Sequence, residues 1–222
     1  MIWVVILPGC HKVHALLLFW ELYGHAPLGD GYKGNSLLLF MIITICGDAG
    51  SGKTTVAKIL AARLGYKSYY IGGLRREMAR EKGMTLEEYN ELGEKDPSTD
   101  RDVDEYQEKL GKEEDNFVIQ GRTSFHFIPH SIKVFIGVDP DVGAKRVWSH
   151  LKEEPHERNE GRLQSVEEVQ ASIKKRVASD QLRYQKYYQL DVYDRSHFDL
   201  VIDSTHLSAV EVVEKILEHI GK

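Results

Sequence analysis

The chain has 222 residues, of which 42% are hydrophobic and 28% are charged, a composition typical of a soluble globular protein that can bury a sizeable core. Its formal net charge is −5, so a general attraction to nucleic acid is not expected, and an anionic substrate would have to be held by locally clustered cations. The only cysteines are Cys10 and Cys46, which imply no disulfide framework and fit a reducing cytoplasm.

Residues 1–40 mix short apolar runs with Pro, Gly and His and show no clear period. Neither apolar run is long enough to span a membrane, and the positive start of a signal peptide is missing. Because Met41 opens the next strand directly, we expect the working domain to begin there and residues 1–40 to be an accessory or even non-native extension. Two alternatives stay open for this extension, a packed helix or a peripheral membrane contact through the apolar cluster at 15–20.

The octet GDAGSGKT, residues 47–54, follows the apolar run MIITIC and precedes a segment, 52–64, with apolar residues at helical spacing. This context predicts a strand, a tight turn and a helix start, in which backbone N–H groups and the helix dipole point at one anion. We expect Lys53 to reach the β- and γ-phosphates of a nucleotide and the Thr54 hydroxyl to bind Mg²⁺. The full set expected to hold the donor is Gly47, Asp48, Ala49, Gly50, Ser51, Gly52, Lys53, Thr54 and Thr55.

Further strand-like runs lie at 67–72, 116–121, 132–138 and 199–203, and helical patterns separate them. This alternation predicts an α/β protein with a parallel central sheet covered on both faces, which together with the phosphate loop gives a three-layer P-loop NTPase fold. In such sheets ligands gather beyond the carboxyl ends of the strands. The phosphate loop, Arg122, Asp139 and residues 203–205 should therefore line one edge.

Two segments interrupt this alternation. Residues 73–112 are typical of short charged helices, punctuated by Gly83, Gly93 and the turn DPSTD, in which Ser98 or Thr99 could cap a helix. Residues 152–164 form a polar stretch between two helices. This stretch is either a solvated surface loop or a mobile lid, which enzymes of phosphoryl transfer use to keep water from the reacting phosphate.

Several arginines lie where cations would be needed. Arg176, Asp180 and Arg183 share one face of the helix expected over 173–188, where a plain surface salt bridge is the simplest interpretation. Arg122 follows a strand and Arg76 opens a charged helix, and neither position is an obvious surface ion pair. Positioned positive charge is what stabilises a phosphoryl group in flight, and an acceptor that is itself a phosphate calls for still more of it.

From Met41 to the C-terminus the sequence resembles the cytidylate kinases of the P-loop nucleoside monophosphate kinase group, and especially their short archaeal-type branch. Beyond the phosphate loop the resemblance rests on GGLRREMAREKGMTLEEYNE, DPSTDRDVDEYQEKL, VIQGR, IKKRVASDQLRYQKYYQLDVYD and DLVIDSTHLSAVEVVEKIL. The R-x-x-x-D-x-x-R helix and the tyrosine-rich tail are its more specific marks. The resemblance implies a kinase domain over 41–222, with a monophosphate-binding insert at 73–112 and a lid at 152–164.

The resemblance also implies the activity, ATP-dependent phosphorylation of a pyrimidine nucleoside monophosphate, CMP or dCMP, to the diphosphate. On the acceptor side it implies that Arg76 grips the phosphate and that Arg122 and Arg183 contact base and phosphate. Arg176 and Asp180 would face the acceptor sugar and the transferring group.

On the donor side, the resemblance implies that Lys53 and the loop glycines hold the phosphates of ATP. Arg146, at the end of the helical stretch DVGAKR, would close over these phosphates, and Arg158 within the lid is a weaker candidate for the same task. Residues 203–205 would lie beneath the donor base.

The sequence departs from the family pattern at two places. Gln120 stands at the end of a central strand where an acidic residue is often found, so Mg²⁺ would depend on Thr54, the phosphates and water. The nearest carboxylates are Asp48 and Asp139, and Asp139 before Pro140 is more simply a helix cap. The pair Gly72 and Gly73 stands where a serine that helps to bind base or sugar could be expected, which leaves the acceptor base open.

Other functions are compatible with parts of this predicted site. A P-loop kinase could act on another nucleotide or a small-molecule alcohol, or the chain could be a non-catalytic nucleotide-binding module. RNA binding finds little support in an acidic chain. We expect small-molecule nucleotides as partners, no stable membrane insertion, a monomer and a cytoplasmic location. The tyrosines of the tail are expected to pack a helix onto the sheet, although base stacking is an alternative for them; they are Tyr184, Tyr187, Tyr188 and Tyr193.

Overall fold

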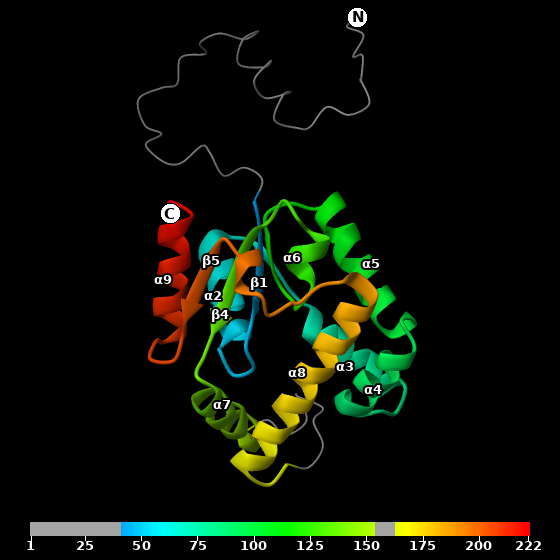
Figure 1. Ribbon diagram of the computed structural model, residues 1–222. Helices are drawn as coiled ribbons and strands as arrows, with labels where there is room; N and C mark the ends of the chain where they lie inside the picture. Colours follow the sequence, from blue (N-terminus) through cyan, green and yellow to red (C-terminus); the bar gives the residue numbers. More distant parts are fainter. Residues whose placement is uncertain (1–40, 154–162) are drawn as a thin grey trace, which may run out of the picture. The chain divides into compact units, whose positions relative to one another are not determined.

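The computed structural model describes residues 41–153 and 163–222 (Figure 1). Residues 1–40 and most of the expected lid, including Arg158, lie outside the described residues. The strands of the described part form one sheet in the order β2-β3-β1-β4-β5, and every neighbouring pair is parallel. They are β1 (Ile42–Gly47), β2 (Lys67–Tyr70), β3 (Phe117–Gln120), β4 (Ile132–Gly137) and β5 (Leu200–Asp203). The predicted parallel α/β sheet is confirmed.

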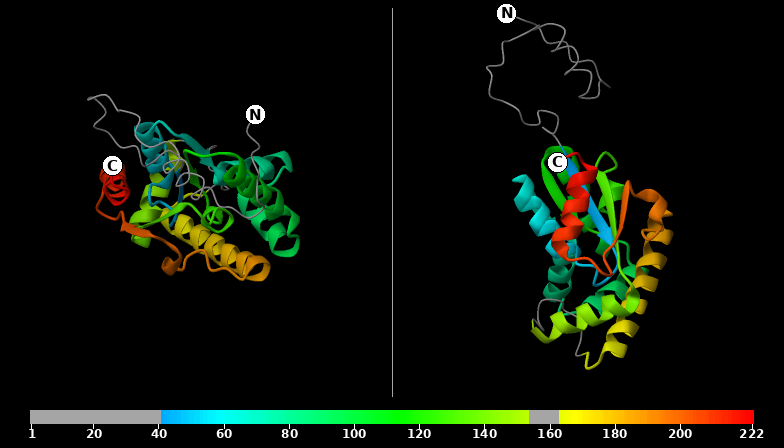
Figure 2. Two further views of the ribbon diagram at one scale, coloured as in Figure 1. Left: turned by 90° about the horizontal axis from the view of Figure 1, so that it is seen from above. Right: turned by 90° about the vertical axis from the view of Figure 1, so that its left-hand side faces the viewer.

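Helices cover both faces of the sheet. They are α2 (Lys53–Leu64), α3 (Ile71–Glu81), α4 (Leu86–Lys95), α5 (Ser98–Glu113), α6 (Ser124–Phe127), α7 (Pro140–Glu153), α8 (Val166–Tyr188) and α9 (Ala209–His219), with a short 3₁₀ helix, η1 (Arg195–His197). Figure 2 shows α2 and α9 on one side of the sheet and the long α8 on the other. The chain therefore folds in three layers. Within the described residues, no helix is both long and apolar enough to cross a membrane.

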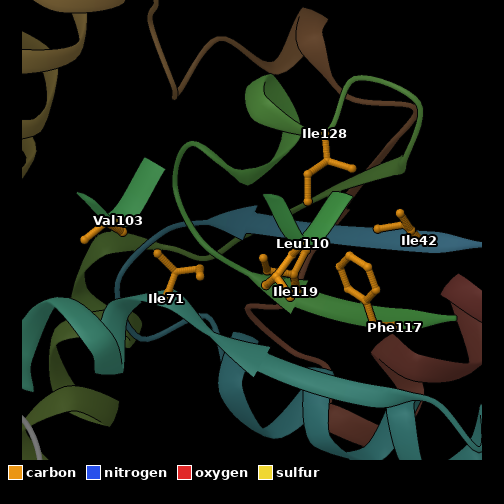
Figure 3. Close-up of a cluster of buried hydrophobic side chains, with 7 residues drawn as sticks. All are labelled: Ile42, Ile71, Val103, Leu110, Phe117, Ile119 and Ile128. Atoms are coloured by element: carbon orange, nitrogen blue, oxygen red, sulfur yellow. The ribbon is translucent and has the colours of Figure 1, made fainter. Parts of the chain in front are cut away.

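A hydrophobic cluster packs α3 and α5 against the middle of the sheet (Figure 3). Phe117 and Ile119 project from the same face of β3 because side chains alternate along a strand, and both are fully buried. The other members are Ile42, Ile71, Val103, Leu110 and Ile128. Burial of these side chains fixes α3 and α5 against β1 and β3. These two helices are the first and last of three helices in 71–113 that we call the insert helices.

A second cluster holds the C-terminal half of α8 against the same sheet. Tyr184 is buried there with Phe125 and Phe135, next to Cys46 at the end of β1. The expectation that the tail tyrosines pack is confirmed for Tyr184, and also for Tyr188 and Tyr193, which are partly buried against the cluster. The hydroxyls of the tail tyrosines other than Tyr184 bind protein groups: that of Tyr187 donates to the Gly93 carbonyl at 2.8 Å, and those of Tyr188 and Tyr193 bind Asp104 and Asp180.

The predicted end of the second strand and the predicted cap of α5 were wrong, and the predicted cap of α7 is confirmed. Strand β2 ends at Tyr70, two residues earlier than predicted, because Ile71 turns into the hydrophobic cluster as the first residue of α3. Neither Ser98 nor Thr99 caps α5; the Asp96 carboxylate accepts the Ser98 N–H at 2.9 Å instead. Asp139 does cap α7, since its Oδ1 accepts the N–H groups of residues 141 and 142 at 3.0 and 3.1 Å.

Candidate active site

The loop between β1 and α2 is shaped by two glycines that touch neighbouring backbone. Gly47 has a φ of 143°, and a Cβ there would lie 2.0 Å from the carbonyl oxygen of Ile136 on β4. Gly50 has a φ of 79°, and its Cβ would lie 2.2 Å from the carbonyl oxygen of Gly143 in α7. Neither site admits a side chain, so these glycines are required by close approach and not only by the turn.

The loop delivers the N-terminus of α2 to the carboxyl end of the sheet with its first N–H groups available. Gly52, in the left-handed region, is the N-cap residue and provides no side-chain acceptor. The first turn of α2 carries no acidic residue. The helix dipole and the uncapped N–H groups therefore favour an external anion at this end.

Lys53 lies against the same loop. Its Nζ donates hydrogen bonds to the Asp48 carbonyl and, at 3.4 Å, to Ser51 Oγ. Burial, with a further contribution from the positive charge of Arg122, lowers the pKa of Lys53 to about 7. A bound anion would reverse this shift, because it favours the charged ammonium.

A cleft of about 720 Å³ opens beside the loop and gathers residues from seven helices and strands. Seven of the nine residues expected to hold the donor line it: Gly47, Ala49, Gly50, Gly52, Lys53, Thr54 and Thr55. Asp48 and Ser51 lie outside the lining; Asp48 Oδ2 accepts the Val138 N–H at 3.2 Å. The other lining residues include four of the predicted arginines, Arg76, Arg122, Arg146 and Arg176. The cleft thus brings the loop between β1 and α2 together with a group of cations.

Two of these arginines are held by backbone carbonyls, one of them also by a tyrosine hydroxyl. Arg76, on α3, donates through Nη1 to the Gly72 carbonyl at 2.9 Å and to the Tyr70 hydroxyl at 2.6 Å. Arg146, on α7, donates through Nη2 to the carbonyls of Ser204 and Thr205, both at 3.1 Å. The segment after β5, expected beneath the donor base, is therefore joined directly to a cleft residue.

Arg122 reaches the cleft with a carboxylate behind it. Its Nε lies 2.6 Å from Asp180 Oδ2, and its guanidinium carbon lies 5.3 Å from the centre of the Tyr193 ring. Burial alone would raise the pKa of Asp180, but the charges of Arg122 and Arg183 outweigh it and hold that pKa below its ordinary value. Asp180 therefore stays ionised and fixes Arg122 in place.

Arg183 and Asp180 do not line the cleft. The Arg183 side chain is fully buried, and its Nη1 donates to both carboxylate oxygens of Asp100 at 2.5 and 2.6 Å, while its Nη2 donates to Asp180 at 2.6 Å. Asp100 also accepts from Arg75 Nη1 at 2.7 Å. The predicted helix face is therefore divided: Arg176 lines the cleft, and the other two residues form a buried ion-pair network behind it.

Sequence reasoning missed the residues that complete this network and part of the wall. Arg75 and Asp100 are both nearly inaccessible to solvent, with residue exposures of 8% and 3%. Tyr70 lines the cleft at the end of β2 and was not considered. The adjacent arginines at 75 and 76 were an available signal, since neighbours on a helix point about 100° apart, so that one of them can face protein while the other faces the cleft.

Comparison with known proteins agrees with this arrangement. Residues 42–206 match the model of the cytidylate kinase-like family. The chain is 37% identical over 179 residues to a cytidylate kinase of Archaeoglobus fulgidus, covering 80% of this chain and 93% of that protein. It is 36% identical over 182 residues to a cytidylate kinase of Methanocella arvoryzae, covering 82% of this chain and 98% of that one.

A solved structure supports the fold alone. The shikimate kinase of Bacteroides thetaiotaomicron superposes with a TM-score of 0.56 at 16% identity, over 82% of this chain and 99% of the other. At this identity the likeness extends to the P-loop kinase architecture and not to the substrate. The layers, the strand order and the position of the phosphate loop are thus those of a P-loop kinase.

Proposed function

Because the chain belongs to the cytidylate kinase-like family, we propose that it transfers the terminal phosphoryl group of ATP to CMP or dCMP and releases the two diphosphates. The observation that carries this proposal is that the phosphate loop lines the same cleft as Arg76, Arg122 and Arg176. A loop alone would suit any nucleotide-binding module. Additional cations in the same cleft can bind a second anion, such as the phosphate of a monophosphate acceptor.

The reaction needs no covalent intermediate. A phosphate oxygen of the acceptor attacks the γ-phosphorus of ATP in line, one oxygen–phosphorus bond forms, and the bond to the bridging oxygen of ADP breaks. Lys53 and the uncapped N–H groups of α2 hold the donor phosphates. Arg76 and Arg122 hold the acceptor phosphate, and Arg176 offsets the charge that gathers between the two anions. Arg183 and Asp180 position Arg122 from behind.

The cleft offers neutral oxygen ligands for Mg²⁺. Mg²⁺ prefers oxygen ligands and keeps several waters, and when bound it neutralises charge on the donor phosphates. The Thr54 hydroxyl lines the cleft next to Lys53 and would be its protein ligand. Gln120 also lines the cleft, is 8% exposed, and its Oε1 has no hydrogen-bond partner among the described residues. With Mg²⁺ bound, this oxygen would be available to accept a hydrogen bond from a water ligand.

The division of the chain follows from the same site. We propose that residues 41–222 are the kinase domain and that α3 to α5 are its monophosphate-binding insert; the lid at 152–164 stays a prediction. We also propose that the active unit is a monomer. Cys46 is a buried free thiol, in keeping with a reducing cytoplasm. Light scattering of the purified protein tests the monomer.

The deciding experiment is a coupled ADP-release assay with CMP, dCMP, UMP and AMP as acceptors. We expect CMP and dCMP to stimulate ADP release most strongly. Faster turnover with UMP or AMP would assign a different acceptor to the same cleft. ATP binding without any acceptor-dependent release would identify a nucleotide-binding module and overturn the proposal.

Replacing Arg176 with alanine should lower kcat/KM for CMP by about 10²–10³-fold, because the cleft loses a cation positioned for the transferring group. The Kd for ATP should change much less, since the phosphate loop is intact. The matched control is Lys174→Ala, which removes one positive charge from an exposed position of the same helix. If the two variants have equal kcat/KM for CMP, Arg176 has no role in the reaction.

The affinity for ATP should fall as the pH rises from 7 to 9. Lys53, with a pKa near 7 in the free protein, loses its proton over this range, while bound phosphates favour the charged form, so binding weakens by up to about tenfold per pH unit. The Lys53→Arg variant keeps its charge at these pH values and should show a flatter dependence. Titration calorimetry at several pH values measures both, and protonation of ATP affects both proteins equally. If the affinity for ATP falls equally with pH in both proteins, Lys53 does not bind the phosphates of ATP.

A further inference from the structure

Tyr70 occupies the point where the sheet passes into the first insert helix. It is the last residue of β2 and the N-cap residue of α3, and its side chain lines the cleft. It is 39% exposed, so part of the ring faces open space. Its hydroxyl oxygen accepts a hydrogen bond from Arg76 Nη1 at 2.6 Å, and the guanidinium carbon lies 5.8 Å from the ring centre.

This contact depends on the two glycines that follow. A Cβ on Gly72 would lie 2.9 Å from Tyr70 Cε2, and a Cβ on Gly73 would lie 2.7 Å from Tyr70 Cδ1. Both distances are shorter than side-chain contacts in proteins allow. The ring therefore packs over the first turn of α3 in space that only a glycine pair leaves open. Glycine is otherwise unfavourable inside a helix, so the pair serves this packing.

The hydroxyl of Tyr70 also completes the restraint on Arg76. The Gly72 carbonyl accepts from the same Nη1 at 2.9 Å, and a guanidinium held at two oxygens loses fewer conformations when an anion binds. The short contact is that of a hydrogen bond with a charged donor, the stronger class. Arg76 itself is only 4% exposed and lines the cleft. Its orientation is thus fixed before the acceptor arrives.

We propose that Tyr70 is a positioning residue for the acceptor phosphate, acting through Arg76, and that Gly72 and Gly73 make this role sterically possible. The inference rests on the proposed function, because Arg76 is taken as the arginine that holds the phosphate of CMP. It assigns to Gly72 and Gly73 a purpose other than base recognition. Tyr70 thereby affects acceptor binding and leaves donor binding unchanged.

The test is Tyr70→Phe, which removes the hydroxyl and keeps the ring. We expect the KM for CMP to rise about tenfold, with kcat within about threefold and the Kd for ATP unchanged. The matched control is Tyr69→Phe: the Tyr69 hydroxyl donates to Glu114 at 2.9 Å, and Tyr69 does not line the cleft. That control should leave the KM for CMP as it is.

Two further variants separate positioning from a general structural role. Gly73→Ala should raise the KM for CMP in the same direction, because its methyl group displaces the Tyr70 ring, while the melting temperature is maintained by the better helix former. In an Arg76→Ala background, adding Tyr70→Phe should change the KM for CMP less than twofold, since the residue acts through Arg76.

Failure of the proposed function and failure of the positioning role of Tyr70 give different results. If CMP does not stimulate ADP release by the unsubstituted protein, the proposed function fails. If CMP does so and Tyr70→Phe matches Tyr69→Phe in its KM for CMP, the positioning role fails alone. The positioning role would also fail if Tyr70→Phe raised the KM for CMP by the same factor with and without Arg76→Ala. It would fail as well if Tyr70→Phe lowered the affinities for ATP and CMP equally.

Discussion

Replacing Lys53 with methionine is expected to lower kcat/KM for ATP by about 10²–10³-fold. The ammonium is the side-chain cation that lies against the phosphate loop, where it donates to the Asp48 carbonyl. Methionine keeps most of the side-chain volume and removes the charge that would stabilise the β- and γ-phosphates. Steady-state kinetics at saturating CMP give the effect on turnover, and calorimetry gives the loss of ATP affinity.

The control for this variant is Lys145→Met. Lys145 is exposed on α7, next to Arg146 in the sequence, and does not line the cleft. The change in net charge is the same, so any general electrostatic effect on ATP appears in both proteins. Turnover by Lys53→Met equal to that of Lys145→Met would show that the donor phosphates are held elsewhere.

The Asp100→Ala variant should lose about 3–5 kcal/mol of its free energy of unfolding, the cost of leaving buried charges without a partner. Arg75 and Arg183 both donate to this carboxylate, and the Arg183 side chain is 0% exposed. Three helices, α3, α5 and α8, lose their common ion pair at once. Urea titration followed by circular dichroism measures the change.

Asp102→Ala is the matched control, because Asp102 is exposed on the same helix two residues away. Its free energy of unfolding should stay within about 0.5 kcal/mol of the unsubstituted protein. If Asp100→Ala is equally stable, the Asp100 carboxylate does not hold the insert helices to α8, and the two arginines must find their partners elsewhere.

The fold and the position of the loop between β1 and α2 could be predicted from local signals. The glycine spacing in residues 47–54, a β-branched run before it and a helical period after it together place a loop at a strand end. The five strands of the described part were likewise visible as short apolar runs. The end of β2 was misplaced because Tyr70 and Ile71 both suit a strand, and only the tertiary packing of Ile71 decides between strand and helix.

The acceptor side could be predicted only in part. Helical spacing brings Arg176, Asp180 and Arg183 to one face, but spacing does not say which of them meets solvent and which meets protein. That depends on Asp100, which is distant in the sequence and reaches α8 only in the folded chain. Arg75 was missed for the same reason, because its partner Asp100 lies on another helix, α5. Tyr70 was missed because the strand was expected to continue to residue 72, which hides the turn that brings its hydroxyl to Arg76.

The contact between Gly50 and Gly143 has a consequence for how the two halves of the cleft are aligned. Main-chain atoms of the phosphate loop and of α7 meet there with no side chain between them. Arg146 follows Gly143 by three residues and so projects from nearly the same side of α7. The distance from the phosphate loop to the backbone that carries Arg146 is therefore set by a contact between main-chain atoms, which substitutions in the surrounding core do not change directly.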